Sequence, residues 1–293
     1  MNEDADHPDA TREGYSSLAE VYHRARPGYP FSIIDLLAAR IGLQPGDPVV
    51  EIGAGTGHFT CLLAERNFRI TALEPVLAMQ QRAPQFPNVT WTQGTFEDTG
   101  LPSGSQRWAV AAQAFHWADA KRALPEVRRV LSPHGWFTML WNAHHIARSP
   151  LLQWTYNFLR QEIPAYHYVD RASSLFRRLS SHLVGAAPYR IQRSLCRVLA
   201  VLGAPDRLSK GILLQLTDDF GRCCYDEVLH SIPVDRQGYL DLWRSRNRLR
   251  SIAGDAAFER FLSHLAEHLA RHSIDRVEIP YVCRAWSARV ADL

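Results

Sequence analysis

The fold is decided by Val49-Val50-Glu51-Ile52-Gly53-Ala54-Gly55-Thr56-Gly57, an apolar run that ends in three alternating glycines. A second apolar run, Ile70-Thr71-Ala72-Leu73-Glu74, ends in a carboxylate. The segment between them, about residues 57–66, has the apolar spacing of a helix. A strand, a glycine loop, a helix and a second strand in this order predict a βαβ unit that binds a nucleotide.

The spacing of the glycines indicates which nucleotide. A loop for a dinucleotide has the pattern G-x-G-x-x-G, but His58 stands here where the third glycine is needed. Glu51 is unfavourable beside a diphosphate and suits a ligand with an ammonium group, such as S-adenosyl-L-methionine. Glu74 is placed to accept hydrogen bonds from both ribose hydroxyls of that ligand. A nicotinamide-dependent oxidoreductase is the alternative, against which the glycine spacing counts.

Three further segments carry a resemblance to a known family. They are Tyr22 to Pro30, Ala112 to Asp119 and Ile279 to Val282. Together with the E-x-G-x-G-x-G pattern at 51–57, they resemble the class I S-adenosylmethionine-dependent methyltransferases, and among them the small-molecule, methyltransferase type 11-like group. The resemblance covers residues 15–147 well and 222–290 loosely, and the segment between has no assigned pattern.

The rest of the chain alternates between apolar strands and helical segments. Strands are expected at 48–52, 69–74, 89–93, 108–115 and 136–142, and helices at 31–41, 57–66, 76–83 and 119–132. This order predicts an α/β fold with a Rossmann-like, doubly wound and mostly parallel sheet. The resemblance implies an antiparallel last strand, and a helical lid is expected as an insertion.

Four parts are therefore expected along the chain. Residues 1–14 form a mobile tail, 15–149 the S-adenosylmethionine-binding core, 150–221 a helical lid or substrate insertion, and 222–293 the C-terminal part that completes the sheet. Between positions 160 and 210 the insertion carries nine basic residues against three acidic ones. This bias fits either an anionic acceptor, such as a carboxylate or a prenyl diphosphate, or a solvated helical face.

The resemblance and the strand ends together give a set of cofactor-binding residues. Glycines at 53, 55 and 57 let the backbone approach the methionyl part closely, and Arg26 is placed to pair with its carboxylate. Many relatives carry Asp where this chain has Thr95, so Glu97 or Asp98 is the alternative acceptor for the adenine amine. The complete set is Tyr22, Arg26, Glu51, Gly53, Ala54, Gly55, Gly57, Glu74, Pro75, Thr95, Phe96, Glu97, Gln113 and Phe115.

The candidate catalytic residue is His116, which lies after the fourth strand and opposite the glycine loop. A histidine of near-neutral pKa can act as a general base while the methyl group is transferred; a structural or cofactor-positioning role is an alternative of at least equal weight. The rings of Phe115 or Trp117 either face the sulfonium or pack in the core. The expected substrate-binding residues are Tyr29, Trp117, Trp141, Tyr156 and Tyr166.

Bulk properties limit the remaining function classes. A net charge of +3 is too small to indicate nucleic-acid binding. Five scattered cysteines without C-x-x-C spacing indicate reduced thiols in a cytoplasm. No secretory signal, membrane span or metal site is expected, since the adjacent His144 and His145 cannot easily share one ion.

The sequence thus predicts a cytoplasmic S-adenosylmethionine-dependent methyltransferase, a monomer or a homodimer. Its methyl group is expected to go to oxygen or carbon of a small organic acceptor, in specialised metabolism. A non-catalytic protein that binds S-adenosylmethionine and a methyltransferase acting on RNA or protein are the alternatives.

Overall fold

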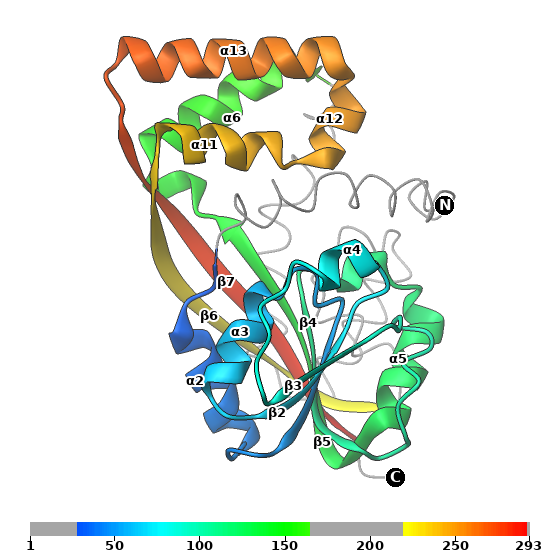
Figure 1. The fold of residues 1–293 in the computed structure, drawn as a ribbon. Helices are drawn as coiled ribbons and strands as arrows, with labels where there is room; N and C mark the ends of the chain where they lie inside the picture. Colours follow the sequence, from blue (N-terminus) through cyan, green and yellow to red (C-terminus); the bar gives the residue numbers. More distant parts are fainter. Residues whose placement is uncertain (1–27, 165–218, 292–293) are drawn as a thin grey trace. The chain divides into compact units, whose positions relative to one another are not determined.

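A computed structural model describes residues 28–164 and 219–291, which divide into two compact units (Figure 1). In the described part of the chain, the sheet unit comprises residues 29–143, 219–228 and 283–291. The helical unit comprises residues 28, 144–164 and 229–282. Strands β5, β6 and β7 contribute residues to both units.

The sheet has seven strands in the order β3-β2-β1-β4-β5-β7-β6. Pairing is parallel between β1 and β2, β1 and β4, β2 and β3, and β4 and β5. The strands are β1 (Pro48–Ile52), β2 (Arg69–Leu73), β3 (Val89–Thr92), β4 (Gln106–Ala112), β5 (Leu131–His144), β6 (Phe220–Asp235) and β7 (Arg276–Val290).

The direction of β7 is opposite to that of its neighbours. The hydroxyls of Thr138 on β5 and Ser287 on β7 are hydrogen-bonded, and the ring of Trp141 packs on that of Trp286. Moving from the first contact to the second, residue numbers increase on β5 and decrease on β7, so the two strands are antiparallel. The predicted Rossmann-like sheet, mostly parallel with an antiparallel last strand, is confirmed.

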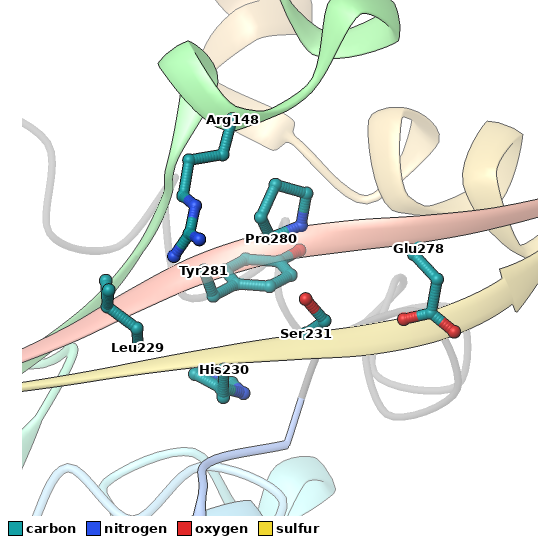
Figure 2. A pocket seen from close by; sticks show the side chains of 7 residues that line it. All are labelled: Arg148, Leu229, His230, Ser231, Glu278, Pro280 and Tyr281. Carbon is teal, nitrogen blue, oxygen red and sulfur yellow. The ribbon is translucent and has the colours of Figure 1, made fainter.

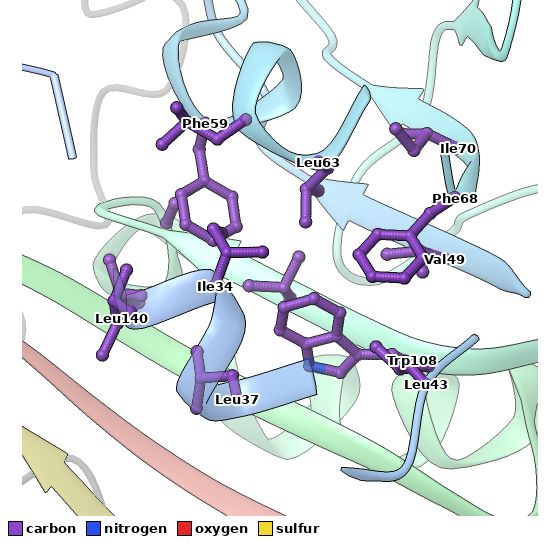
Figure 3. Packing of buried hydrophobic residues seen from close by; sticks show 14 of the residues in the cluster. Ile34, Leu37, Leu43, Val49, Phe59, Leu63, Phe68, Ile70, Trp108 and Leu140 are labelled. Carbon is purple, nitrogen blue, oxygen red and sulfur yellow. The ribbon is translucent and has the colours of Figure 1, made fainter. Parts of the chain in front are cut away.

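Alternation along β1 distributes its side chains to the two faces of the sheet. Val49 belongs to the core beneath α2 (Phe31–Ile41) and α3 (His58–Glu65), where Trp108 is fully buried (Figure 3). Val50 and Ile52 belong to the core beneath α5 (Ala120–Val130). Because a strand has a side-chain period of two, helices on both faces follow from one apolar strand.

The first described helix shows how local pattern produces an element. Four apolar residues of α2, at helical spacing, are buried: Ile33, Ile34, Leu37 and Ile41. Gly42 ends the helix in the left-handed conformation (φ 74°), and its N–H donates to the Ala38 carbonyl. The predicted helix over 31–41 is therefore confirmed.

One predicted strand ends earlier than expected. The sequence predicts a strand over 108–115, but β4 ends at Ala112 because Gln113 has a φ of +57°. A short 3-10 turn, η1 (Phe115–Trp117), follows. The remaining helix of this region is α4 (Leu77–Gln80).

The helical unit has a core of its own. It consists of η2 (Ile146–Arg148), α6 (Pro150–Glu162), α11 (Arg236–Arg244), α12 (Asn247–Ala253) and α13 (Asp255–Arg271). Tyr239, Trp243 and Phe261 are fully buried at its centre. The expected lid over 150–221 begins with α6, but most of it lies outside the described residues and stays a prediction. Within the described ranges, none of the helices has the length and apolar content needed to cross a bilayer.

Candidate active site

Four loops follow the carboxyl ends of adjacent parallel strands in the sheet unit. They comprise residues 53–57 after β1, 74–76 after β2, 93–98 after β3 and 113–117 after β4. Strands β3, β2, β1 and β4 are neighbours in this order and run in the same direction. The four loops therefore lie along one edge of the sheet, which is where open α/β sheets bind their ligands.

The glycines of the first loop have different functions. A Cβ on Gly53 (φ 76°) would lie 2.5 Å from the Cβ of Ala114, so this glycine lets the loops after β1 and β4 touch. Gly55 (φ 59°) has no described atom within 4 Å of its Cβ position. Gly57 (φ 84°) is the N-cap of α3. The close approach of Ala114 thus requires a glycine at position 53, whereas the space beside Gly55 is open to a ligand.

Glu74 is fixed by two backbone amides. The N–H of Gly55 donates to its Oε2 at 2.8 Å, and the N–H of Val76 donates to its Oε1 at 2.9 Å. The residue is 7% exposed. A carboxylate oxygen can accept more than one hydrogen bond, so a carboxylate held in this way is of a chemical type that suits a diol.

Glu51 lies beneath the glycine loop. Its side chain is 1% exposed, and the hydroxyl of Thr60 on α3 donates to its Oε2 at 2.6 Å. Burial raises the pKa of Glu51 to about 8, so the carboxyl is largely protonated at pH 7. This position favours a role in ordering the loop over direct contact with an ammonium group.

The loop after β3 turns one aromatic ring inward. Thr95 closes the turn, because its hydroxyl accepts from the N–H of Asp98. Phe96 is buried, and its ring meets that of Phe115 edge to face at 5.2 Å. Glu97 accepts from the N–H of Asp119 at 2.7 Å and so joins this loop to the start of α5.

The loop after β4 separates two neighbouring aromatic residues. The side-chain amide of Gln113 donates to the Asn142 carbonyl at 2.9 Å. Phe115 is 2% exposed and belongs to the core, while Trp117 is 50% exposed. His116 is also exposed, and its ring lies 4.8 Å from that of Trp117. Of the two aromatic residues Phe115 and Trp117, Phe115 therefore packs in the core. Trp117 is exposed beside His116.

The other predicted site residues fall in several places. Tyr29 is half-buried, with its ring edge-on to Phe59, and Trp141 is half-buried against Trp286. Tyr156 lies in the helical unit, where its hydroxyl is 3.2 Å from Nδ1 of His144. Ala54 is buried and Pro75 half-buried in the loops after β1 and β2. Three predicted residues lie outside the described ranges: Tyr22, Arg26 and Tyr166.

Sequence reasoning missed the supports of the site. Thr60 holds Glu51, Ala114 receives Gly53, and Asn142 holds Gln113. Only Thr60 had a local signal, since it faces β1 from the helix that follows the glycine loop. No group of three side chains able to hold a metal ion occurs within residues 28–164 and 219–291.

Residues 50–139 match a family model described as a methyltransferase domain. These residues include all four loops. The chain contains a methyltransferase domain.

Curated relatives match the same part of the chain. An uncharacterized methyltransferase of Mycobacterium tuberculosis (strain ATCC 25618 / H37Rv) is 38% identical over 130 residues, which are 44% of this chain and 51% of the relative. An uncharacterized methyltransferase of Schizosaccharomyces pombe is 32% identical over 123 residues, 41% of this chain and 49% of the relative. The chain thus spans about half the length of the curated relatives it matches.

A solved structure supports the fold of the methyltransferase domain. A protein named as a type II methyltransferase from Anaeromyxobacter dehalogenans aligns with a TM-score of 0.54 at 20% identity, covering 90% of this chain and 97% of that protein. At this identity the likeness concerns the fold alone. The predicted resemblance to class I methyltransferases is confirmed, and the predicted cofactor is the one that this class of domain uses.

Proposed function

We propose that this protein binds S-adenosyl-L-methionine at the four loops of its methyltransferase domain and transfers the methyl group to a small organic acceptor. The observation that carries the proposal is Glu74, whose carboxylate is fixed beside Gly55 at the end of β2. A fixed carboxylate suits the two hydroxyls of a ribose. The open space at the Cβ position of Gly55 fits a close ligand.

The same geometry counts against a dinucleotide. His58 is the first residue of α3, where a dinucleotide loop needs a glycine so that the helix can approach the strand. The glycine spacing therefore favours a ligand without a diphosphate.

The protein has a limited chemical task in this proposal. The sulfonium supplies an already activated methyl group, so the residues mainly align the acceptor. His116 lies on the exposed turn after β4, where it can take a proton from a hydroxyl or an acidic carbon of the acceptor. Oxygen and carbon acceptors are proposed on this basis, in a cytoplasmic enzyme of specialised metabolism. An acceptor carrying a carboxylate or a diphosphate is the variant that the basic segment 160–210 favours.

The binding half of the proposal is tested by calorimetric titration with S-adenosyl-L-methionine and with NAD. Wild type is compared with Glu74→Ala and with Glu65→Ala, a control on an exposed carboxylate of α3. Hydrogen bonds to a charged group contribute about 1.5–3 kcal/mol each, so Glu74→Ala should raise Kd at least about 10-fold. The control should bind as wild type does. Binding of NAD alone, or of neither ligand, would refute the proposal.

The catalytic half is tested by release of S-adenosylhomocysteine in the presence of a panel of phenols, hydroxy acids and carboxylic acids. Turnover with at least one small acceptor is expected. Binding without turnover across the whole panel would instead support a non-catalytic protein. Methylation of RNA or of protein alone would contradict the small-molecule acceptor.

A further inference from the structure

The helical unit contains a pocket of about 320 Å³ that includes no residue of the four loops (Figure 2). Seven residues from η2, β6 and β7 line it. This volume is at the lower end of the range for small-molecule sites. All seven residues belong to one compact unit, so the pocket does not depend on how the two units are arranged.

Opposite charges stand at the two ends of the pocket. Figure 2 shows Arg148 at one end and Glu278 at the other, with Pro280, Tyr281 and Ser231 between them. Within residues 28–164 and 219–291, the side chains of Arg148 and Glu278 make no ion pair with each other or with another residue. Both charges are therefore available to a ligand.

Side-chain contacts hold the wall between the charges. Tyr281 is 3% exposed, and its hydroxyl lies 2.9 Å from Nε2 of His144. Its ring stacks on that of His230 with centroids 5.5 Å apart. Burial lowers the pKa of His230, which disfavours its charged form, and Arg148 supplies the positive charge at this end of the pocket.

The backbone also fixes the position of Arg148. The N–H of His145 donates to the carbonyl of Pro280 at 2.8 Å, and the N–H of Arg148 donates to the carbonyl of His145 at 3.0 Å. Ser149 then caps α6 by accepting from the N–H of Leu152. Arg148 is thus held on a short turn that is tied to the strand forming the floor of the pocket.

We propose that this pocket binds a small zwitterion in an extended conformation. Arg148 holds its carboxylate, Glu278 holds its ammonium group, and Pro280 and Tyr281 contact the apolar chain between the two. A simple dicarboxylate is disfavoured because its second charge would face Glu278. A diamine is disfavoured because one of its charges would face Arg148.

The test uses ω-amino acids of increasing length, from glycine to 8-aminooctanoate, titrated into the full-length protein by calorimetry. Because Pro280, Tyr281 and Ser231 lie between the two charges, affinity should rise from glycine to a maximum at a longer member. The alkanoate and the alkylamine of the same chain length should each bind at least 10-fold more weakly than that member. Equal binding of all three, or no binding by any ω-amino acid, would overturn the proposal.

Charge-matched variants locate the site. Arg148→Ala and Glu278→Gln should each weaken the best ω-amino acid at least 10-fold. The controls Arg260→Ala and Glu267→Gln make the same changes of charge at exposed positions of α13 in the same unit and should bind as wild type does. Thermal unfolding establishes that each variant is folded. Equal losses in variants and controls would show a general charge effect and would overturn the proposal.

Discussion

Replacing Gly53 by alanine tests how the glycine loop is built. The backbone there has a φ of +76°, and a Cβ would lie 2.5 Å from the Cβ of Ala114. The left-handed conformation costs an ordinary L residue about 1–2 kcal/mol. Forcing an extra methyl group into a packed position costs about 1–3 kcal/mol more. We therefore expect Gly53→Ala to lower the free energy of unfolding by about 2–5 kcal/mol.

Gly55→Ala is the matched control. Gly55 has the same kind of backbone (φ 59°), but no described atom lies within 4 Å of its Cβ position. Its substitution should cost only the conformational part, about 1–2 kcal/mol. A Cβ at this position would nevertheless occupy the open space that we assign to the ligand. Gly55→Ala should therefore lower the binding free energy of S-adenosyl-L-methionine by more than it lowers the free energy of unfolding.

Urea denaturation followed by circular dichroism measures the two free energies. Hydrogen exchange of peptides from β1 and β4 then assigns the loss to the sheet unit, because two units need not unfold in one transition. The double variant Gly53→Ala/Ala114→Gly removes the contact between the two Cβ atoms. Its free energy of unfolding should therefore recover most of the difference between Gly53→Ala and Gly55→Ala. Equal losses in Gly53→Ala and Gly55→Ala, without recovery in the double variant, would refute the reasoning.

Three further results are expected. Because the pKa of Glu51 is raised to about 8 in the folded protein, wild type should lose stability as the pH rises from about 4.5 to 8, by up to about 1.4 kcal/mol per pH unit. The variant Glu51→Gln should not show this loss. A difference between the urea midpoints of the two proteins that does not change with pH would contradict the prediction. Arg40→Ala breaks the bidentate pair with the buried Asp226 and should cost about 1.5–3 kcal/mol in urea denaturation, which Arg40→Ala/Asp226→Ala should partly restore. His116→Asn should reduce kcat about 100-fold or more at pH 7 with little change in cofactor Kd; an unchanged pH profile of kcat would argue against a general base.

Adjacent residues show what a sequence pattern can and cannot predict at this site. Phe115 and Trp117 are both aromatic and both follow an apolar strand, yet one is 2% exposed and the other 50%. The separation depends on the turn at Gln113, which is held by carbonyls of Leu140 and Asn142 on the next strand. No local pattern contains that information, because the partners are brought together only when the sheet forms.

Glu51 and Glu74 make the same point for charge. Glu51 was predicted two residues before the first glycine and Glu74 at the end of the second strand; Glu51 lies in β1, and Glu74 follows β2 directly. Their surroundings differ, because Glu51 is enclosed beneath α3 with a hydroxyl partner while Glu74 accepts hydrogen bonds from backbone amides of the loops. Burial raises the pKa of Glu51, and the residue type alone does not predict that shift.

The sequence by itself determined the architecture of the methyltransferase domain. Apolar periodicity defined the helix over 31–41 and the parallel strands, and the glycine and carboxylate spacing located the loops of the proposed cofactor site, because these signals act over a few residues. Only the tertiary structure decided the contact of Gly53 with Ala114, the protonation of Glu51 and the pocket between Arg148 and Glu278. Each of these depends on residues distant in sequence, whose distances and burial are fixed only once the strands have paired and packed.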